Sequence, residues 1–255
     1  MRIEINAERR GESPVNAGTG GRNPAKFLKA DKAERGTMIK IENFEVVGWE
    51  HAIRGMRNPM NSWDKSDSAG IGEMCCIGKN DLDLMRRLVK AGTDHRKFMR
   101  MIVVYADITA PIYWWKEADT YKVGTVRNSC STMHKITEKE FTLDDFSHDR
   151  LLVVEKLETI IDWLNKYRDI YVNWDKHRKY VDSNGVELTK KDIWWQLIQL
   201  LPSSYNQKAT LMLNYEVLAN MYHSRKNHKL DEWVEFCKWI ETLPYSELIT
   251  GEGEQ

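Results

Sequence analysis

The sequence predicts an α/β (α+β) fold, in which a sheet is combined with long helices. Two observations predict strands: residues 38–49 alternate polar and apolar side chains, and the segment around Val103 and Val104 is rich in β-branched residues. A third observation is that apolar residues recur at helical spacing in several longer segments, which predicts amphipathic helices. With 255 residues, of which 42% are hydrophobic, the chain is long enough to bury the core of one large domain.

The N-terminal segment differs in composition from the rest of the chain. Residues 1–36 are rich in Gly, Asn, Arg and Glu and carry almost no periodic apolar pattern. This composition predicts a disordered leader over residues 1–36 and places the folded domain at residues 37–255. The first strand is expected to begin near Met38.

A short amphipathic helix is expected at Trp49–Asn58, followed by a polar loop over residues 60–72. Pro59 stops the helix because proline cannot continue the backbone hydrogen bonding. Polar residues of this region could line a phosphate or a ribose, although a solvated loop is the simpler interpretation. The residues concerned are Arg54, Arg57, Ser62, Ser66 and Ser68. Asp81 is the expected N-cap of the next helix, which Gly92 ends.

Further helices are expected in the second half of the chain. Residues 143–170 contain one long helix. Its apolar face consists of Leu151, Leu152, Val154, Leu157, Ile160, Ile161 and Leu164. Thr189 is the expected N-cap of a helix that ends at Pro202, and Asp231 or Glu232 opens a later one.

Another helix is expected within residues 201–233, with Ser203 or Ser204 as its N-cap. Asn214 and Arg225 are eleven positions apart in this helix. They therefore project within about 20° of each other and lie about 16 Å apart along the axis. A long ligand could contact both residues. The alternative is that Asn214 caps a buried polar gap and Arg225 is solvated near the helix end, where a cation is favoured.

The same segment carries a spaced set of residues that points to a known family. After LP-x-S come Asn214, Leu218, Asn220 and Arg225, followed by Glu232 and Trp233. This pattern resembles the C-terminal segment of the flavin-dependent thymidylate synthases. The resemblance implies an α/β fold with a mixed sheet, in which Asn214 and Asn220 contact FAD. It also implies that Arg225 is the catalytic residue, which binds and polarises the pyrimidine of dUMP. Where the family has an Arg two residues after the first Asn, this chain has Glu216.

A second segment is similar to the same family in the order of its elements. His95 follows a helix end and precedes a strand and a polar aromatic stretch, where the family has Arg-His-Arg-x-x-Ser-x-Asn-Glu-x-Ser-x-Arg. The positions that match are Asn128 and Ser131. The Arg-His-Arg positions hold Tyr121, Lys122 and Val123. The resemblance implies that His95 helps to hold the flavin. The implied substrate-binding residues are Lys122, Asn128, Ser131 and Arg225.

Some residues of this second segment have simpler explanations. The Trp114–Trp115 pair could stack on a flat ring, but packing in the core is the favoured interpretation. Lys122 could equally form a surface salt bridge with Glu117 or Asp119. Asp107 stands in an otherwise apolar strand and needs a partner, which the sequence does not identify.

Charge and cysteine content exclude several classes of function. Lys plus Arg and Asp plus Glu are both 38, so no global field draws the chain to nucleic acid or to an anionic membrane. The four cysteines form no C-x-x-C pair, which favours a reduced, cytoplasmic protein. His177, His223 and His228 lie too far apart for a metal site. No apolar run reaches about 18 residues and no charged-then-apolar leader is present, so neither a membrane span nor a signal peptide is expected.

The function implied by the resemblance is that of a flavin-dependent thymidylate synthase. Methylenetetrahydrofolate supplies one carbon to C5 of dUMP, reduced FAD delivers a hydride, and NADPH is the reductant. The resemblance also implies a homotetramer, because this family builds its active sites between subunits. One alternative is a non-catalytic nucleotide- or flavin-binding protein that kept the helix and lost the reaction. Another is a helical interaction protein, in which Arg225 and the tryptophans form a protein interface.

Overall fold

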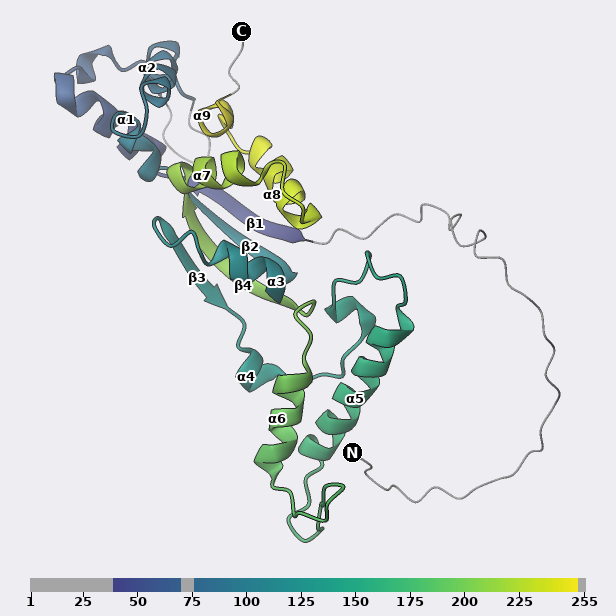
Figure 1. Ribbon diagram of the computed structural model, residues 1–255. Coiled ribbons are helices and arrows are strands. Elements are labelled where there is room, and N and C mark those ends of the chain that lie inside the picture. Colours follow the sequence, from purple (N-terminus) through teal and green to yellow (C-terminus); the bar gives the residue numbers. More distant parts are fainter. Residues whose placement is uncertain (1–38, 70–75, 252–255) are drawn as a thin grey trace, which may run out of the picture.

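The computed structural model describes residues 39–69 and 76–251 of the chain. The expected leader at residues 1–36 lies outside the described residues, as do the first two residues of the expected domain. The described chain contains a four-stranded sheet, a group of helices packed against it, and a pair of helices beside it (Figure 1).

The sheet has the strand order β1-β2-β4-β3, and every neighbouring pair is antiparallel. Its strands are β1 (Lys40–Val47), β2 (Val103–Pro111), β3 (Thr125–Ser129) and β4 (Asn206–Asn214). Buried and more exposed residues alternate along β2, because successive side chains of a strand point to opposite faces. The expected α/β (α+β) class is confirmed, with an antiparallel sheet in place of the expected mixed one.

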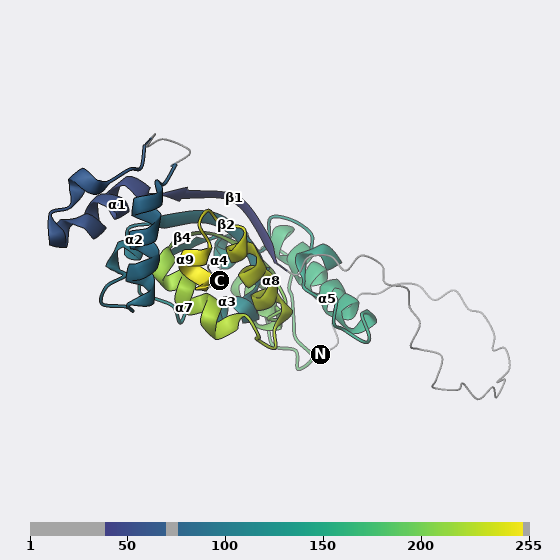
Figure 2. The ribbon, with the colours of Figure 1, turned by 90° about the horizontal axis from the view of Figure 1, so that it is seen from above.

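Helices cover one face of this sheet and enclose the main hydrophobic core. They are α1 (Trp49–Arg57), α2 (Lys79–Lys90), α3 (Ile112–Ala118), α7 (Tyr215–Arg225), α8 (Asp231–Glu241) and α9 (Glu247–Thr250). Figure 2 shows α7, α8 and α9 grouped together. In the core, the ring of Trp114 lies 4.9 Å from that of Trp115 and 4.8 Å from that of Trp233. The interpretation of the Trp114–Trp115 pair as core residues is confirmed.

The segment before α7 is a strand, where a helix capped by Ser203 or Ser204 was expected. Ala209, Leu211 and Leu213 are buried at a spacing of two. Strand β4 pairs with β2 along one edge and with β3 along the other. These ladders on both sides override the helical spacing of the apolar residues, and α7 begins only after Asn214.

Two other helices begin elsewhere than expected. The long helix α5 spans Glu155–Val172, so Leu151, Leu152 and Val154 of its expected apolar face precede it, and residues around Ser147 are extended and bond to the segment before β4. Ser147 N donates to Ser204 O over 2.8 Å, and Leu152, expected on the apolar face, is 100% exposed. Asp81 is not a cap, because α2 begins two residues earlier and Asp81 lies buried in its first turn.

A second hydrophobic cluster joins α5 to α6 (Lys190–Leu200), away from the sheet (Figure 1). Leu157, Ile161 and Leu164 of α5 are buried in it, as their spacing predicts. The hydroxyl of Thr189 caps α6 by accepting from Asp192 N, which confirms the expected start of that helix. The short helix α4 (Thr132–Lys135) lies between the cluster and β3.

Asp107 finds its partners on the face of the sheet opposite the core. Strand alternation turns its side chain outward, where it accepts hydrogen bonds from Thr210 Oγ1 over 2.6 Å and Asn43 Nδ2 over 3.1 Å. Lys208 Nζ lies 3.3 Å from the same carboxylate. The hydrogen bonds from Thr210 and Asn43 lower the pKa of Asp107 from its usual value.

No helix within the described residues is long and apolar enough to cross a membrane. In the same ranges, no group of three or more His, Cys, Asp or Glu side chains is placed to hold a metal ion.

Candidate functional site

The start of α7 is held by Asn214 and by the turn that leads into β3. Asn214 Oδ1 accepts a hydrogen bond from Val217 N over 2.9 Å, which satisfies one of the free N–H groups of the first turn. The backbone N–H of Asn214 donates to Gly124 O over 3.3 Å. Gly124 has a φ of 81°, and a Cβ there would lie 2.3 Å from Asn214 Nδ2. Glycine therefore lets this turn lie directly on the N-terminus of α7.

Arg225, at the C-terminal end of α7, is paired and largely enclosed rather than solvated. Its Nη1 donates to Glu117 Oε2 over 2.8 Å, and its Nε donates to Tyr121 Oη over 3.0 Å. The guanidinium carbon lies 5.0 Å from the centre of the Trp233 ring, and Trp233 Nε1 also donates to Glu117 Oε2. His228 Nε2 lies 2.9 Å from Arg225 Nη1. The resemblance implies that the positive charge of Arg225 acts on a pyrimidine, but here that charge is offset by a carboxylate of the same chain.

The two carboxylates proposed as partners of Lys122 are engaged elsewhere. Glu117 holds Arg225, and Asp119 accepts two hydrogen bonds from Arg127 Nη1, over 2.9 Å and 3.0 Å. Lys122 is exposed, in the turn between Tyr121 and Gly124. The expected salt bridge of Lys122 is therefore absent among the described residues.

Glu216, which stands where the family pattern has an Arg, is paired with an arginine from another part of the chain. Arg96 Nε lies 3.0 Å from Glu216 Oε2, and Arg96 Nη2 donates to Glu216 Oε1 over 3.2 Å. Both side chains are largely buried, at 15% and 11% exposure. The first turn of α7 therefore carries a neutral ion pair where the family pattern has a cation.

A small cavity of about 120 Å³ opens beside the Arg225 cluster. Its lining includes Trp115, Tyr121, Lys122, Thr125 and Arg127. The guanidinium carbon of Arg127 lies 4.6 Å from the centre of the Trp115 ring, which orients this cation across the aromatic wall. Small-molecule sites commonly enclose about 300–1,000 Å³, so this cavity has room for only part of a ligand, such as a base or a phosphate.

The structure does not bring all of the expected site residues together. The turn that contains Lys122 connects two of them, because Tyr121 bonds to Arg225 and Gly124 contacts Asn214. Asn128 is exposed and pairs with Thr210 of β4, whose side chain points to the open face of the sheet. The remaining expected residues are His95, exposed after α2, Asn220, exposed on α7, and Ser131, the N-cap of α4 beside a cavity of about 290 Å³.

Sequence reasoning missed the residues that hold Arg225. Glu117, considered only as a partner of Lys122, and Tyr121, considered only as a replaced signature position, both bond to the guanidinium. The partner of Glu216 was not identified either. Pairing residues that lie 108 positions apart requires the tertiary fold, so no local signal in the sequence could have found it.

FAD is the cofactor that the resemblance implies, and the described residues do not fit it well. A dinucleotide carries a diphosphate, which proteins bind with cations or with backbone N–H groups. On α7, Arg225 is paired with Glu117, and Glu216 with its partner Arg96 replaces the family cation. The side-chain oxygen of Asn214 is already used as a cap. These residues leave no unpaired cation on α7 for a diphosphate.

Comparison with solved structures identifies relatives in fold. Thymidylate Synthase X (ThyX) from Helicobacter pylori, crystallised with FAD and dUMP, matches with a TM-score of 0.56 and 16% identity over 84% of this chain and 97% of that one. A second structure of ThyX from the same organism with FAD and dUMP gives a TM-score of 0.55 and 16% identity, over 84% and 98% of the two chains. The UMP/dUMP methylase PolB from Streptomyces cacaoi, bound with 5-Br dUMP, gives 0.57 and 13% identity, over 84% and 95%.

No family model matches the sequence, and no curated protein matches it. At 13–16% identity, the likeness to the solved structures concerns the fold and not the reaction. The chain therefore has a fold like that of ThyX and of the dUMP methylase PolB, with a site whose charges are arranged differently from the family pattern.

Proposed function

We propose that the protein binds a uracil nucleotide beside α7 and has lost the flavin-dependent reaction of the synthases that its fold resembles. One observation carries this proposal: Glu117 holds Arg225 in an ion pair, with Tyr121 and Trp233 around it. A residue that must stabilise charge developing on a pyrimidine acts best when its own charge is not already offset. The pair favours binding over catalysis.

The cavity next to this cluster supports a nucleotide as the ligand. Tyr121 offers part of its ring to a base, and Arg127 and Lys122 offer cations for a phosphate. Asp119 offsets Arg127, whereas Lys122 is free of the two acidic neighbours that could have paired with it. A mononucleotide could seat one group in the cavity and leave the rest at the surface.

The test is calorimetry with dUMP and FAD, combined with an absorbance spectrum of the purified protein. Wild type is expected to be colourless, to bind dUMP and to take up no added FAD. Lys122→Ala should weaken dUMP binding roughly tenfold, as expected for the loss of one hydrogen bond to a charged group. Lys116→Ala is the matched control, because Lys116 is exposed on α3 and does not line the cavity. Unchanged dUMP affinity in Lys122→Ala would count against this site.

A second candidate is the complete reaction, favoured by the order of Asn214, Asn220 and Arg225 along α7. In that case the chain transfers one carbon from methylenetetrahydrofolate to dUMP, with FAD as cofactor and NADPH as reductant, in the cytoplasm. The missing cations would have to come from other copies of the chain in a homotetramer. An apolar row on the open face of the sheet offers a surface for such assembly: Tyr105, Met212 and Val126.

Two measurements separate the candidates. Bound flavin in the purified protein, together with thymidylate formation, would establish the second candidate and overturn the first. Light scattering at micromolar concentration tests the assembly, because a monomer would leave the diphosphate without its cations.

A further inference from the structure

A larger cavity lies between α1 and residues 61–68. Figure 1 shows α1 at one end of the molecule. It encloses about 450 Å³, within the range of about 300–1,000 Å³ that is common for small-molecule sites. Helix α1 contributes Glu50, Ile53, Arg54 and Arg57 to its lining. The opposite wall includes Trp63.

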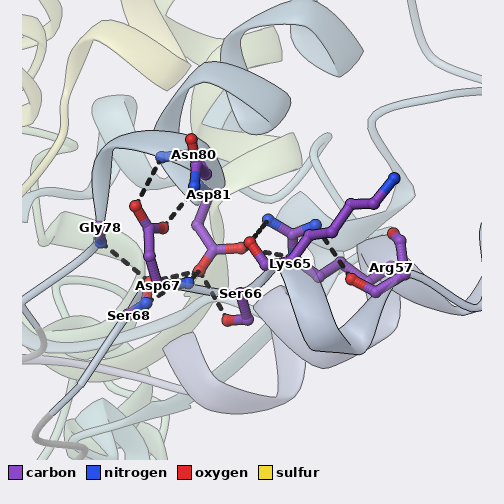
Figure 3. Close-up of polar contacts among 9 residues, drawn as sticks. Arg57, Lys65, Ser66, Asp67, Ser68, Gly78, Asn80 and Asp81 are labelled. Carbon is purple, nitrogen blue, oxygen red and sulfur yellow. Dashed lines mark hydrogen bonds and ion pairs between the residues drawn. The ribbon is translucent and has the colours of Figure 1, made fainter.

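The base of this cavity is a buried ion pair between Arg57 and Asp81, which are 4% and 0% exposed (Figure 3). Arg57 Nε donates to Asp81 Oδ1 over 2.6 Å. Its Nη1 and Nη2 donate to the backbone oxygens of Ser62 and Lys65, over 3.1 Å and 3.0 Å. A guanidinium has five N–H donors, so Arg57 keeps two beyond these three bonds.

The other carboxylate oxygen of Asp81 fixes the opposite wall. Oδ2 accepts from the hydroxyls of Ser66 and Ser68, each over 2.7 Å, and from two backbone N–H groups of the same segment. Burial alone would raise the pKa of Asp81, but hydrogen bonds from Ser68 and Ser66 and the Arg57 guanidinium outweigh burial and lower the pKa. Asp67 in turn accepts from the backbone N–H groups of Asn80 and Asp81 at the start of α2 (Figure 3). The cavity wall is thus held in one shape without a ligand.

Three residues that line the cavity lie outside the hydrogen-bond network of Arg57 and Asp81 and are exposed to a ligand. Trp63 is 51% exposed, and its Nε1 donates to Asn58 Oδ1 over 2.8 Å, which fixes the ring while leaving surface accessible. Arg54 and Glu50 are exposed on α1 and lie one turn apart. Among the described residues, neither Arg54 nor Glu50 forms an ion pair. Because Arg57 is offset by Asp81, Arg54 is the cation that this cavity can offer to an anion.

We propose that this cavity is a second ligand site, which binds a nucleoside monophosphate. The base stacks on Trp63, and an N–H group of the base donates to Glu50. The phosphate accepts from Arg54 and from the remaining donors of Arg57. The ribose hydroxyls donate to Ser66 and Ser68, whose own protons are directed at Asp81. The site is separate from the nucleotide site proposed beside α7 and does not depend on it.

The experiment is calorimetry of the full chain with AMP as the probe and inorganic phosphate as the comparison. Arg54→Ala and Trp63→Ala should each weaken AMP binding about tenfold, and phosphate alone should bind at least tenfold more weakly than AMP. The matched controls are Arg87→Ala on α2 and Trp195→Ala on α6, both of which change an exposed residue of the same type outside the cavity. Thermal melts check that each variant is folded.

Four results would overturn the proposal. Wild type could fail to bind AMP below about 1 mM, where the binding free energy is only about −4 kcal/mol. Either Arg54→Ala or Trp63→Ala could bind AMP as wild type does. Phosphate could bind as tightly as AMP, which would leave Trp63 without a role. AMP binding could instead be lost in Lys122→Ala, which would place AMP beside α7.

Discussion

Arg57 and Arg225 each form an ion pair with a carboxylate far away in the sequence, but the two pairs differ in burial. Arg57 and Asp81 are 2.6 Å apart and are 4% and 0% exposed. Arg225 and Glu117 are 2.8 Å apart and are 19% and 35% exposed. The first pair lies beneath a cavity, and the second is partly exposed next to one.

Because of this difference in burial, the Arg57 pair stabilises the folded structure, whereas a ligand can replace the carboxylate in the Arg225 pair. Opening a fully buried pair leaves an uncompensated charge, which costs about 3–5 kcal/mol. A pair that water reaches contributes about 0–1 kcal/mol, because solvent screens it. A ligand can therefore compete with Glu117 for Arg225, whereas displacing Asp81 from Arg57 carries the larger cost of a buried, uncompensated charge.

The largest effect is expected for Asp81→Asn. The amide keeps the shape of the carboxylate but leaves the Arg57 charge buried without its counter-ion, so the free energy of unfolding should fall by roughly 3–5 kcal/mol. For a chain of this size, that loss lowers the melting temperature on the order of 10 °C. Urea and thermal melts would measure it. Asp83→Asn, on the exposed side of the same helix, should melt as wild type does. A stable Asp81→Asn protein would show that the pair is dispensable.

A smaller effect, on binding rather than folding, is expected for Arg225→Ala. Loss of a charge-assisted hydrogen bond should weaken dUMP binding by roughly 1.5–3 kcal/mol. The free energy of unfolding should change by only about 1 kcal/mol, because the pair with Glu117 is partly exposed. Calorimetry and thermal melts on the same samples check both values. If the variant binds dUMP normally and melts several degrees lower, Arg225 is a structural residue, and its assignment to the ligand fails.

Local sequence patterns predicted the helices well where caps and apolar spacing involve residues a few positions apart. Thr189 caps α6 through Asp192, three residues away, and the buried stripe of α5 follows the helical period. Strand β4 was missed although Ala209 and Leu211 alternate with Thr210, because longer-range apolar spacing suggested a helix. A strand of this kind is fixed by pairing on both edges, which no local window contains.

The site was less predictable than the fold, because its contacts span long stretches of the chain. Asp81 was expected to be an N-cap, since a short carboxylate suits a cap and a buried acceptor equally well. Only the tertiary fold brings it to Arg57, and brings Glu117 to Arg225. The resemblance to the synthases predicted the fold, but it did not predict the carboxylate that offsets the charge of Arg225.

Glu117→Gln should sharpen the contrast between the two pairs. Removing the negative charge frees Arg225 for a ligand anion or carbonyl, so dUMP should bind about three- to tenfold more tightly, equivalent to about 0.6–1.4 kcal/mol. Gln can still accept the hydrogen bond from Trp233, so the melting temperature should change little. Calorimetry with dUMP measures the gain, and Glu235→Gln, which removes an exposed carboxylate on α8, is the control. Weaker dUMP binding in Glu117→Gln would mean that the carboxylate itself contacts the ligand.

The smallest expected effect is the dependence of stability on acid. The pKa of Asp81 is lowered in the folded protein, so the unfolded chain takes up a proton at this residue first as the pH falls. The stabilisation from Asp81 is therefore fully present above its unfolded pKa of about 3.9 and is lost as the pH falls through the lower folded value. Urea melts between neutral pH and the acid range should show a steeper loss of stability for wild type than for Asp81→Asn, which cannot take up that proton. Parallel curves for the two proteins would show that the pKa of Asp81 is the same in the folded and unfolded states, and its carboxylate charge would then contribute no stability through the pair with Arg57.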